Sequence, residues 1–146
     1  MKAILLGLAL MTAESVKPEA DGGLLCDFKP SKPFEGYQGC LVVITPKSHR
    51  IYGIVTGRTF ANAEEAREER ARLLKLLEAK YGKALPENPK FPDFRTIQTG
   101  GRTVTIGGNK PGGAHVGLGY TDKDLGATAQ SERKAIDAAE ADASGL

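Results

Sequence analysis

A turn between two apolar runs carries the most compact group of chemically active side chains in the sequence. Residues 46–50 read Pro-Lys-Ser-His-Arg, so two cations and a histidine stand beside a hydroxyl. Lys47, His49 and Arg50 could hold an anion, and His49 could form a hydrolytic pair with Ser48 if their side chains met at hydrogen-bond distance. No GxSxG motif surrounds Ser48. We therefore predict a polar hairpin turn that is better suited to recognition than to catalysis.

A glycine-rich loop at residues 107–113, GGNKPGG, is the second candidate. A phosphate-binding loop would need Lys-Ser or Lys-Thr after its glycines and a helix next, and this loop has neither. We predict an exposed connection of the kind that often contacts partners. The predicted binding residues on the turn, on the loop and just after it are Lys47, His49, Arg50, Asn109, Lys110 and His115.

The two histidines leave one further catalytic alternative, a hydrolase that pairs His115 with Asp122 or Asp124. Metal chemistry is not expected, because His49 and His115 show none of the HxH, HxxxH or HExxH spacings. We assign no catalytic residue, no metal ligand and no cofactor.

Gly117 and Gly119 alternate on one face of the last expected strand. Glycine weakens a strand, so two on one face indicate that something packs closely there. We expect the long helix of residues 62–81 to cover them. The alternative is a shallow site for a partner or ligand, bounded by His115 and Thr121.

The N-terminus is typical of a secretory signal. Lys2 precedes a short apolar run at residues 3–11, which is too short for a helix that spans a bilayer, and a polar stretch follows. Small residues at Ala13 and Ser15 favour cleavage before Val16. The alternative is that the run belongs to the fold as a strand or buried helix. The predicted organisation is a signal peptide at 1–15, one domain at 16–124, and an alanine-rich helical tail at 125–146.

Cys26 and Cys40 are the two cysteines. In a periplasmic or secreted protein such a pair favours one disulfide. In a protein that is not exported they would be two reduced, buried thiols.

The rest of the chain predicts an α+β fold with two layers. Asn62 and Glu65 form a capping box for an amphipathic helix that ends before Gly82. The order is ββαβββα, with one long helix packed on an antiparallel sheet, a weak C-terminal helix and a further brief strand near residues 23–28. The expected strands lie at 40–45, 50–55, 94–98, 102–106 and 114–121.

Composition restricts the function. The 146 residues carry a net charge of +2, which is too small to favour a nucleic-acid or membrane-surface binder. We predict a small exported, non-enzymatic domain that binds another protein, such as a protein inhibitor or an envelope accessory factor. Two alternatives remain open: the small hydrolase using His49 or His115, and an assembly component that self-associates through a sheet edge or its tail.

Overall fold

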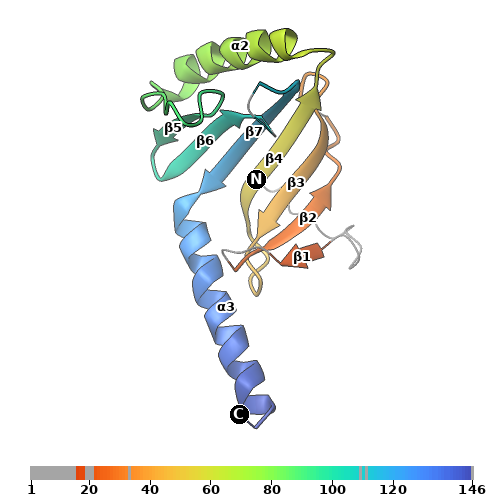
Figure 1. Ribbon diagram of the computed structural model, residues 1–146. Helices are drawn as coiled ribbons and strands as arrows, with labels where there is room; N and C mark the ends of the chain where they lie inside the picture. Colours follow the sequence, from red (N-terminus) through yellow and green to blue (C-terminus); the bar gives the residue numbers. More distant parts are fainter. Residues whose placement is uncertain (1–15, 19–21, 33, 109, 111, 146) are drawn as a thin grey trace.

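A single antiparallel sheet organises the chain (Figure 1). The computed structural model describes residues 16–18, 22–32, 34–108, 110 and 112–145. The seven strands lie side by side in the order β1-β2-β3-β4-β7-β6-β5, and every neighbouring pair is antiparallel. The predicted α+β fold with an antiparallel sheet is therefore confirmed. The elements are β1 (Val16–Pro18), β2 (Leu24–Phe28), β3 (Gln38–Ile44), β4 (Ile51–Thr59), α2 (Ala63–Tyr81), β5 (Arg95–Thr99), β6 (Arg102–Gly107), β7 (His115–Asp122) and α3 (Lys123–Ala143).

Two strands, β1 and β2, precede the five main strands that the sequence predicts. The brief strand expected near residues 23–28 is β2, which pairs with β3. Residues 16–18, for which the sequence predicted no strand, form β1 at the sheet edge, with Val16 opposite Cys26. Alternation in so short a segment gives no strand signal, so pairing with β2 decides its conformation.

The long helix α2 begins and ends where its capping residues predict. The Asn62 side chain accepts a hydrogen bond from the Glu65 N–H at 2.9 Å, and the Glu65 carboxylate accepts one from the Ala61 N–H at 3.3 Å. Gly82 ends the helix with φ +111°, a conformation that glycine adopts without strain.

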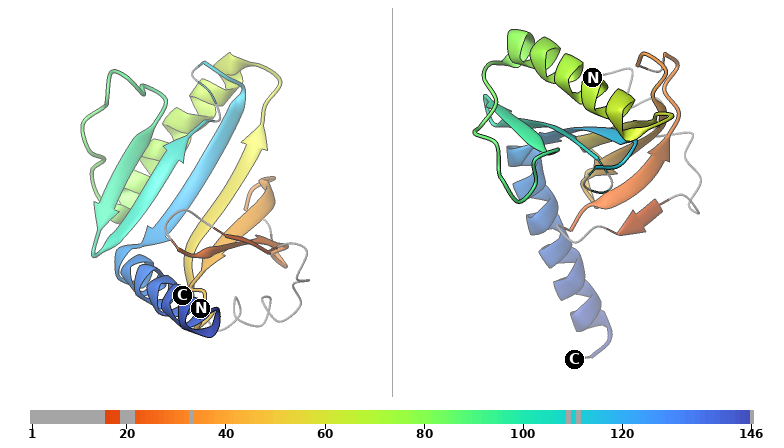
Figure 2. Two further views of the ribbon diagram at one scale, coloured as in Figure 1. Left: turned by 60° about the horizontal axis from the view of Figure 1, so that its bottom comes forward. Right: turned by 45° about the horizontal axis from the view of Figure 1, so that its top comes forward.

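The helix α2 covers one face of β5, β6 and β7, which we call the helix-covered face (Figure 2, left). Leu73 is fully buried against this face. The strand residues of this core are Ile97, Val104, Ile106, Val116, Leu118 and Tyr120.

Because side chains alternate along a strand, Gly117 and Gly119 point to the opposite face of β7. The expectation that α2 covers these glycines is therefore wrong. The branched and aromatic residues of β7 compete for the same helix, and burying them releases more free energy than burying glycine.

The loop between β2 and β3 fastens α2 at its side. The Tyr37 hydroxyl donates to Glu69 at 3.0 Å, and the Arg72 guanidinium donates to Glu35 at 2.6 Å and to Glu69 at 2.8 Å. Burial and the bond to Glu69 raise the pKa of Tyr37, whereas the bonds from Arg72 lower the pKa of Glu69. These contacts fix the helix relative to the β2 side of the sheet.

The helix α3 continues directly from β7 and extends away from the sheet (Figure 1). Asp122 caps it by accepting from the Leu125 N–H at 3.0 Å. Only the first half packs on the sheet: Ala129 is fully buried, and Gly126 lies against the Tyr52 ring. The helix is thus well formed, although its apolar stripe is as thin as the sequence predicts.

Candidate partner-binding face

The turn between β3 and β4 has a structural role. The buried Thr45 hydroxyl accepts from the Arg50 N–H at 2.8 Å and lies 2.7 Å from the Ser48 hydroxyl. His49 adopts the left-handed conformation, with φ +54°. The Ser48 hydroxyl is therefore engaged by Thr45, and no hydrogen bond between described residues joins it to His49.

An acidic residue of α3 occupies the place that an anion would take at this turn. The Glu132 carboxylate accepts from the Lys47 N–H at 2.9 Å and from the Ser48 N–H at 3.1 Å. Burial raises the pKa of Glu132, but hydrogen bonding by the Ser48 side chain, these two amide bonds and the charge of Lys47 outweigh it and lower the pKa overall. The turn thus anchors α3, and the exposed side chains of Lys47, His49 and Arg50 project around that anchor.

The glycine-rich loop lies at the opposite end of the sheet from this turn. The strand β4 runs from the turn to Thr59, which pairs with His115 at the start of β7. Nine extended residues span about 26 Å, so the turn and the loop do not share one binding surface. Lys110 is exposed on the loop, and Asn109 lies outside the described residues.

An ion pair between the buried Arg70 and the half-buried Asp93 holds the loop and the start of β7. Arg70 of α2 is 8% exposed and lies 3.4 Å from the Asp93 carboxylate. Its guanidinium also donates to the His115 carbonyl at 3.2 Å, while Asp93 accepts from the Gly112 N–H at 2.8 Å. This network places His115 rigidly at the end of the sheet.

His115 cannot pair directly with either proposed acid. Its Nδ1 lies 3.1 Å from the Thr59 hydroxyl. Asp122 stands seven residues along the same extended strand, about 23 Å away, and Asp124 follows in the first turn of α3. The geometry brings neither predicted hydrolytic pair together.

The face opposite α2 is formed by β3, β4, β7, β6 and β5, and we call it the open face. Its residues at the centre of the sheet carry no formal charge. Val55, near the middle, is 44% exposed. By alternation and register the open face comprises Leu41, Val43, Gly53, Val55, Gly57, Thr59, Thr96, Gln98, Thr103, Thr105, Gly107, His115, Gly117, Gly119 and Thr121.

A row of three glycines crosses the open face. Gly117 is directly opposite Gly57 on one side and Gly107 on the other. The His115 ring lies over Gly57, where a Cβ would be 2.5 Å from its Nε2. The Phe94 ring lies over Gly107, where a Cβ would be 2.6 Å from the ring. We name Gly117 and the two rings beside it the glycine strip.

Sequence analysis identified part of this strip. His115, Gly117 and Gly119 were singled out, whereas Gly57, Gly107 and Phe94 were missed. Their alignment depends on the register of β7 with its sequence neighbour β6 and with β4, which is far from both in sequence. The available signal was that Gly57 interrupts an apolar and β-branched run, whereas Gly107 ends one.

The two cysteines lie on neighbouring strands. Cys26 is opposite Val42 and Cys40 is opposite Phe28, so the cysteines are diagonal neighbours on the helix-covered side. Both thiols are free, and burial raises the pKa of each. Diagonal neighbours are about 7–8 Å apart, beyond the usual Cα separation of a disulfide. The disulfide stays a prediction, and it requires the strands to shift.

The outer edges of the sheet are partly blocked. At the β5 edge, the Leu85 N–H donates to the Thr96 carbonyl at 2.8 Å, and Arg95 donates to the Leu85 carbonyl at 3.3 Å. At the other edge, β1 is three residues long and ends with Pro18, which lacks an N–H. Such edges are poor templates for pairing with another chain.

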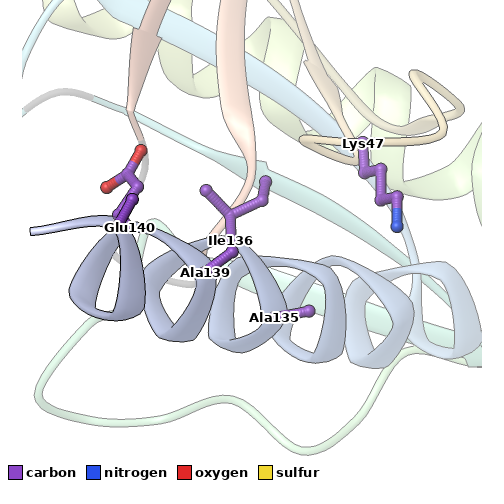
Figure 3. Close-up of a pocket in the computed structure, with 6 residues that line it drawn as sticks. Lys47, Ala135, Ile136, Ala139 and Glu140 are labelled. Carbon is purple, nitrogen blue, oxygen red and sulfur yellow. The ribbon is translucent and has the colours of Figure 1, made fainter. Parts of the chain in front are cut away.

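A hollow of about 420 Å³ lies between α3 and the β3–β4 turn (Figure 3). Ile136 and three alanines form its apolar wall, and Lys47 and Glu140 stand at its rim. This is the part of α3 that extends beyond the sheet, so the wall belongs to a single helix face.

Within the described ranges, no three His, Cys, Asp or Glu side chains gather as a metal site would require. The described helices include none that is long and apolar enough to cross a membrane. The chain matches no known protein family, no curated protein and no solved structure.

Proposed function

We propose that this chain is a small exported, non-enzymatic domain that binds another protein through the open face. The observation that carries the proposal is the absence of formal charge across the fifteen open-face residues of β3, β4, β7, β6 and β5, in a chain of which 26% is charged. The exposed Asp27 of β2, opposite Leu41, lies at the rim of this surface. The centres of protein–protein interfaces are depleted of charged residues in the same way.

Exposed apolar side chains support the same surface. Val55 is 44% exposed at its middle, and Phe94, which lies over Gly107 beside β5, is 49% exposed. Phe91 is 59% exposed and accepts a backbone hydrogen bond from Phe94 at 3.0 Å. Large exposed apolar groups beside an uncharged surface are typical of sites that bind proteins.

The N-terminal pattern supports export to the periplasm or the medium. The strand β1 at Val16–Pro18 and the six strands that follow it all lie after the proposed cleavage point. All seven strands could therefore form in a mature chain. Intact mass of the purified native protein tests this: we expect the loss of residues 1–15, with a deficit of about 2 Da removed by reductant if Cys26 and Cys40 are bridged.

Site-specific photo-crosslinking tests the binding role. A photoreactive benzoylphenylalanine placed at Val55 or Gln98 should form an adduct of one defined mass in an envelope fraction. Excess unmodified protein should compete the adduct away. The same group at Leu76, which is 45% exposed on α2, should form none.

Equal capture from Leu76 would show that adducts do not depend on the open face and would refute the proposal. An adduct with twice the mass of the chain would favour the self-associating alternative. The identity of a captured partner would distinguish an inhibitor, which binds an enzyme, from an accessory factor, which binds an envelope component.

A further inference from the structure

The second half of α3 carries an apolar stripe past the end of the sheet. Residues 137–143 are all exposed, and this part of the helix stands clear of the sheet (Figure 1, Figure 2). The stripe packs on the sheet at the fully buried Ala129 and continues through Ile136, Ala139 and Ala143, at steps of seven, three and four residues. Such steps keep side chains on one face of a helix, at the spacing by which helices pack on one another.

Opposite charges stand at the two ends of the hollow beside this stripe. Lys47 lies at the end nearer the sheet, and Glu140 lies toward the end of α3 (Figure 3). Among the described residues, no ion pair includes the Lys47 ammonium or the Glu140 carboxylate. The hollow therefore presents a cation, an apolar wall and an anion in that order along the helix.

The last turn of α3 points independently to a cation from another molecule. Glu140 and Asp142 lie within the last four residues of the helix, and its last turn contains no basic residue. Carboxylates are unfavourable there, because the C-terminal end of a helix carries partial negative charge. Arg133 pairs with Asp137 at 3.9 Å, one turn earlier. A positive group brought by a bound molecule would stabilise this end of α3.

A second copy of the chain would bring that positive group. Two copies of α3 can pack antiparallel about a twofold axis that passes between Ile136 and Ala139. Each Glu140 then faces Ala135 of the other copy. Because Lys47 stands at the Ala135 end of the hollow, it meets this Glu140. The axis exchanges the two ends of the hollow, so the opposite charges pair twice.

We infer that this chain forms an antiparallel dimer through the second half of α3. The surface fits a copy of itself because it carries both complementary charges, and its alanines let two helices approach closely. The wall from Ala135 to Ala143 extends about 12 Å along the helix. So small a contact gives a weak dimer, with a Kd on the order of 100 μM. The open face takes no part, so the inference does not rest on the proposed function.

Sedimentation equilibrium of the native protein tests the dimer, at concentrations from about 10 μM to about 1 mM. We expect the average mass to rise toward twice that of one chain. Lys47→Glu and Glu140→Lys should each weaken association at least about fivefold, because each places like charges together at both ends. Lys134→Glu makes the same charge change as Lys47→Glu on the opposite, exposed side of α3, and should alter the Kd less than about twofold.

Mixing Lys47→Glu with Glu140→Lys separates a lost contact from a damaged fold. In the mixed dimer the new glutamate faces the new lysine, and the native Lys47 of one copy faces the native Glu140 of the other. The mixture should therefore associate with a Kd within about twofold of the native value, although each variant alone associates weakly. A variant with a damaged α3 would not recover in this way.

A constant mass of one chain up to about 1 mM would overturn the inference. So would association that Lys47→Glu and Glu140→Lys leave unchanged, an equal loss caused by Lys134→Glu, or a mixture that associates no better than its components. Crosslinking from Val55 reports on the open face and does not require this dimer. The dimer and the proposed function therefore fail separately.

Discussion

The two faces of the same strands have opposite compositions. On the helix-covered face, Val104, Ile106 and Val116 are at most 3% exposed beneath α2. On the open face, the intervening positions hold threonine and glycine, and Val55 at the centre is 44% exposed. Since the strands are shared, backbone requirements cannot explain this difference. One face supplies stability through apolar burial, and the other presents threonine and glycine residues without formal charge.

The difference between the two faces should be largest in the effect of a core substitution on stability. Leu73→Ala removes a fully buried side chain and should lower the free energy of unfolding by about 2–5 kcal/mol. Val55→Ala on the open face should lower it by less than about 0.5 kcal/mol. Urea denaturation measures both. A large loss of stability for Val55→Ala would mean that the open face is part of the core.

Glycine substitutions test whether the glycines of the open face differ in their need for a bare backbone. Gly117→Ala should raise the free energy of unfolding by about 0.5–1 kcal/mol, because the strand loses a flexible residue and the methyl group fits. Gly57→Ala should lower it by about 1 kcal/mol, because the methyl group displaces His115 from its bond with Thr59. Thermal unfolding measures both changes in the free energy of unfolding. If Gly117→Ala and Gly57→Ala shifted it in the same direction, the distinction between these glycines would be wrong.

The clamp between α3 and the β3–β4 turn should depend on pH. The folded-state pKa of Glu132 is lowered, so its stabilisation is complete above the unfolded pKa of about 4.3 and is lost as pH falls through the folded value. Hydrogen exchange at the Lys47 and Ser48 amides should therefore lose protection in acid. Glu132→Gln should show reduced protection that no longer varies over this range. A wild-type profile that is flat with pH would contradict the clamp.

Features that depend on residues close together in the chain could be predicted from the sequence. The capping box of Asn62 and Glu65, Gly82 at the helix end, and the turn between β3 and β4 each depend on residues close together in the chain. These features predicted the helix and the antiparallel hairpin correctly.

Strand register and contacts between distant residues could not be predicted from the sequence. The side of β7 that faces α2, the alignment of Gly57 with Gly117 and Gly107, and the contact of Glu132 with a turn 84 residues away all require the register of the sheet. A slip of one residue would exchange the two faces. The glycines of β7 were therefore noticed but assigned to the wrong neighbour.

The most direct test compares one substitution on the open face with its counterpart on α2. Val55 and Leu76 are 44% and 45% exposed, and each would be changed to glutamate. Affinity for the crosslinked partner would be measured by calorimetry, after circular dichroism has shown that both variants fold. We predict that Val55→Glu weakens binding roughly 30-fold, about 2 kcal/mol, whereas Leu76→Glu changes it less than twofold. Equal losses, or a larger loss for Leu76→Glu, would contradict the assignment of partner binding to the open face.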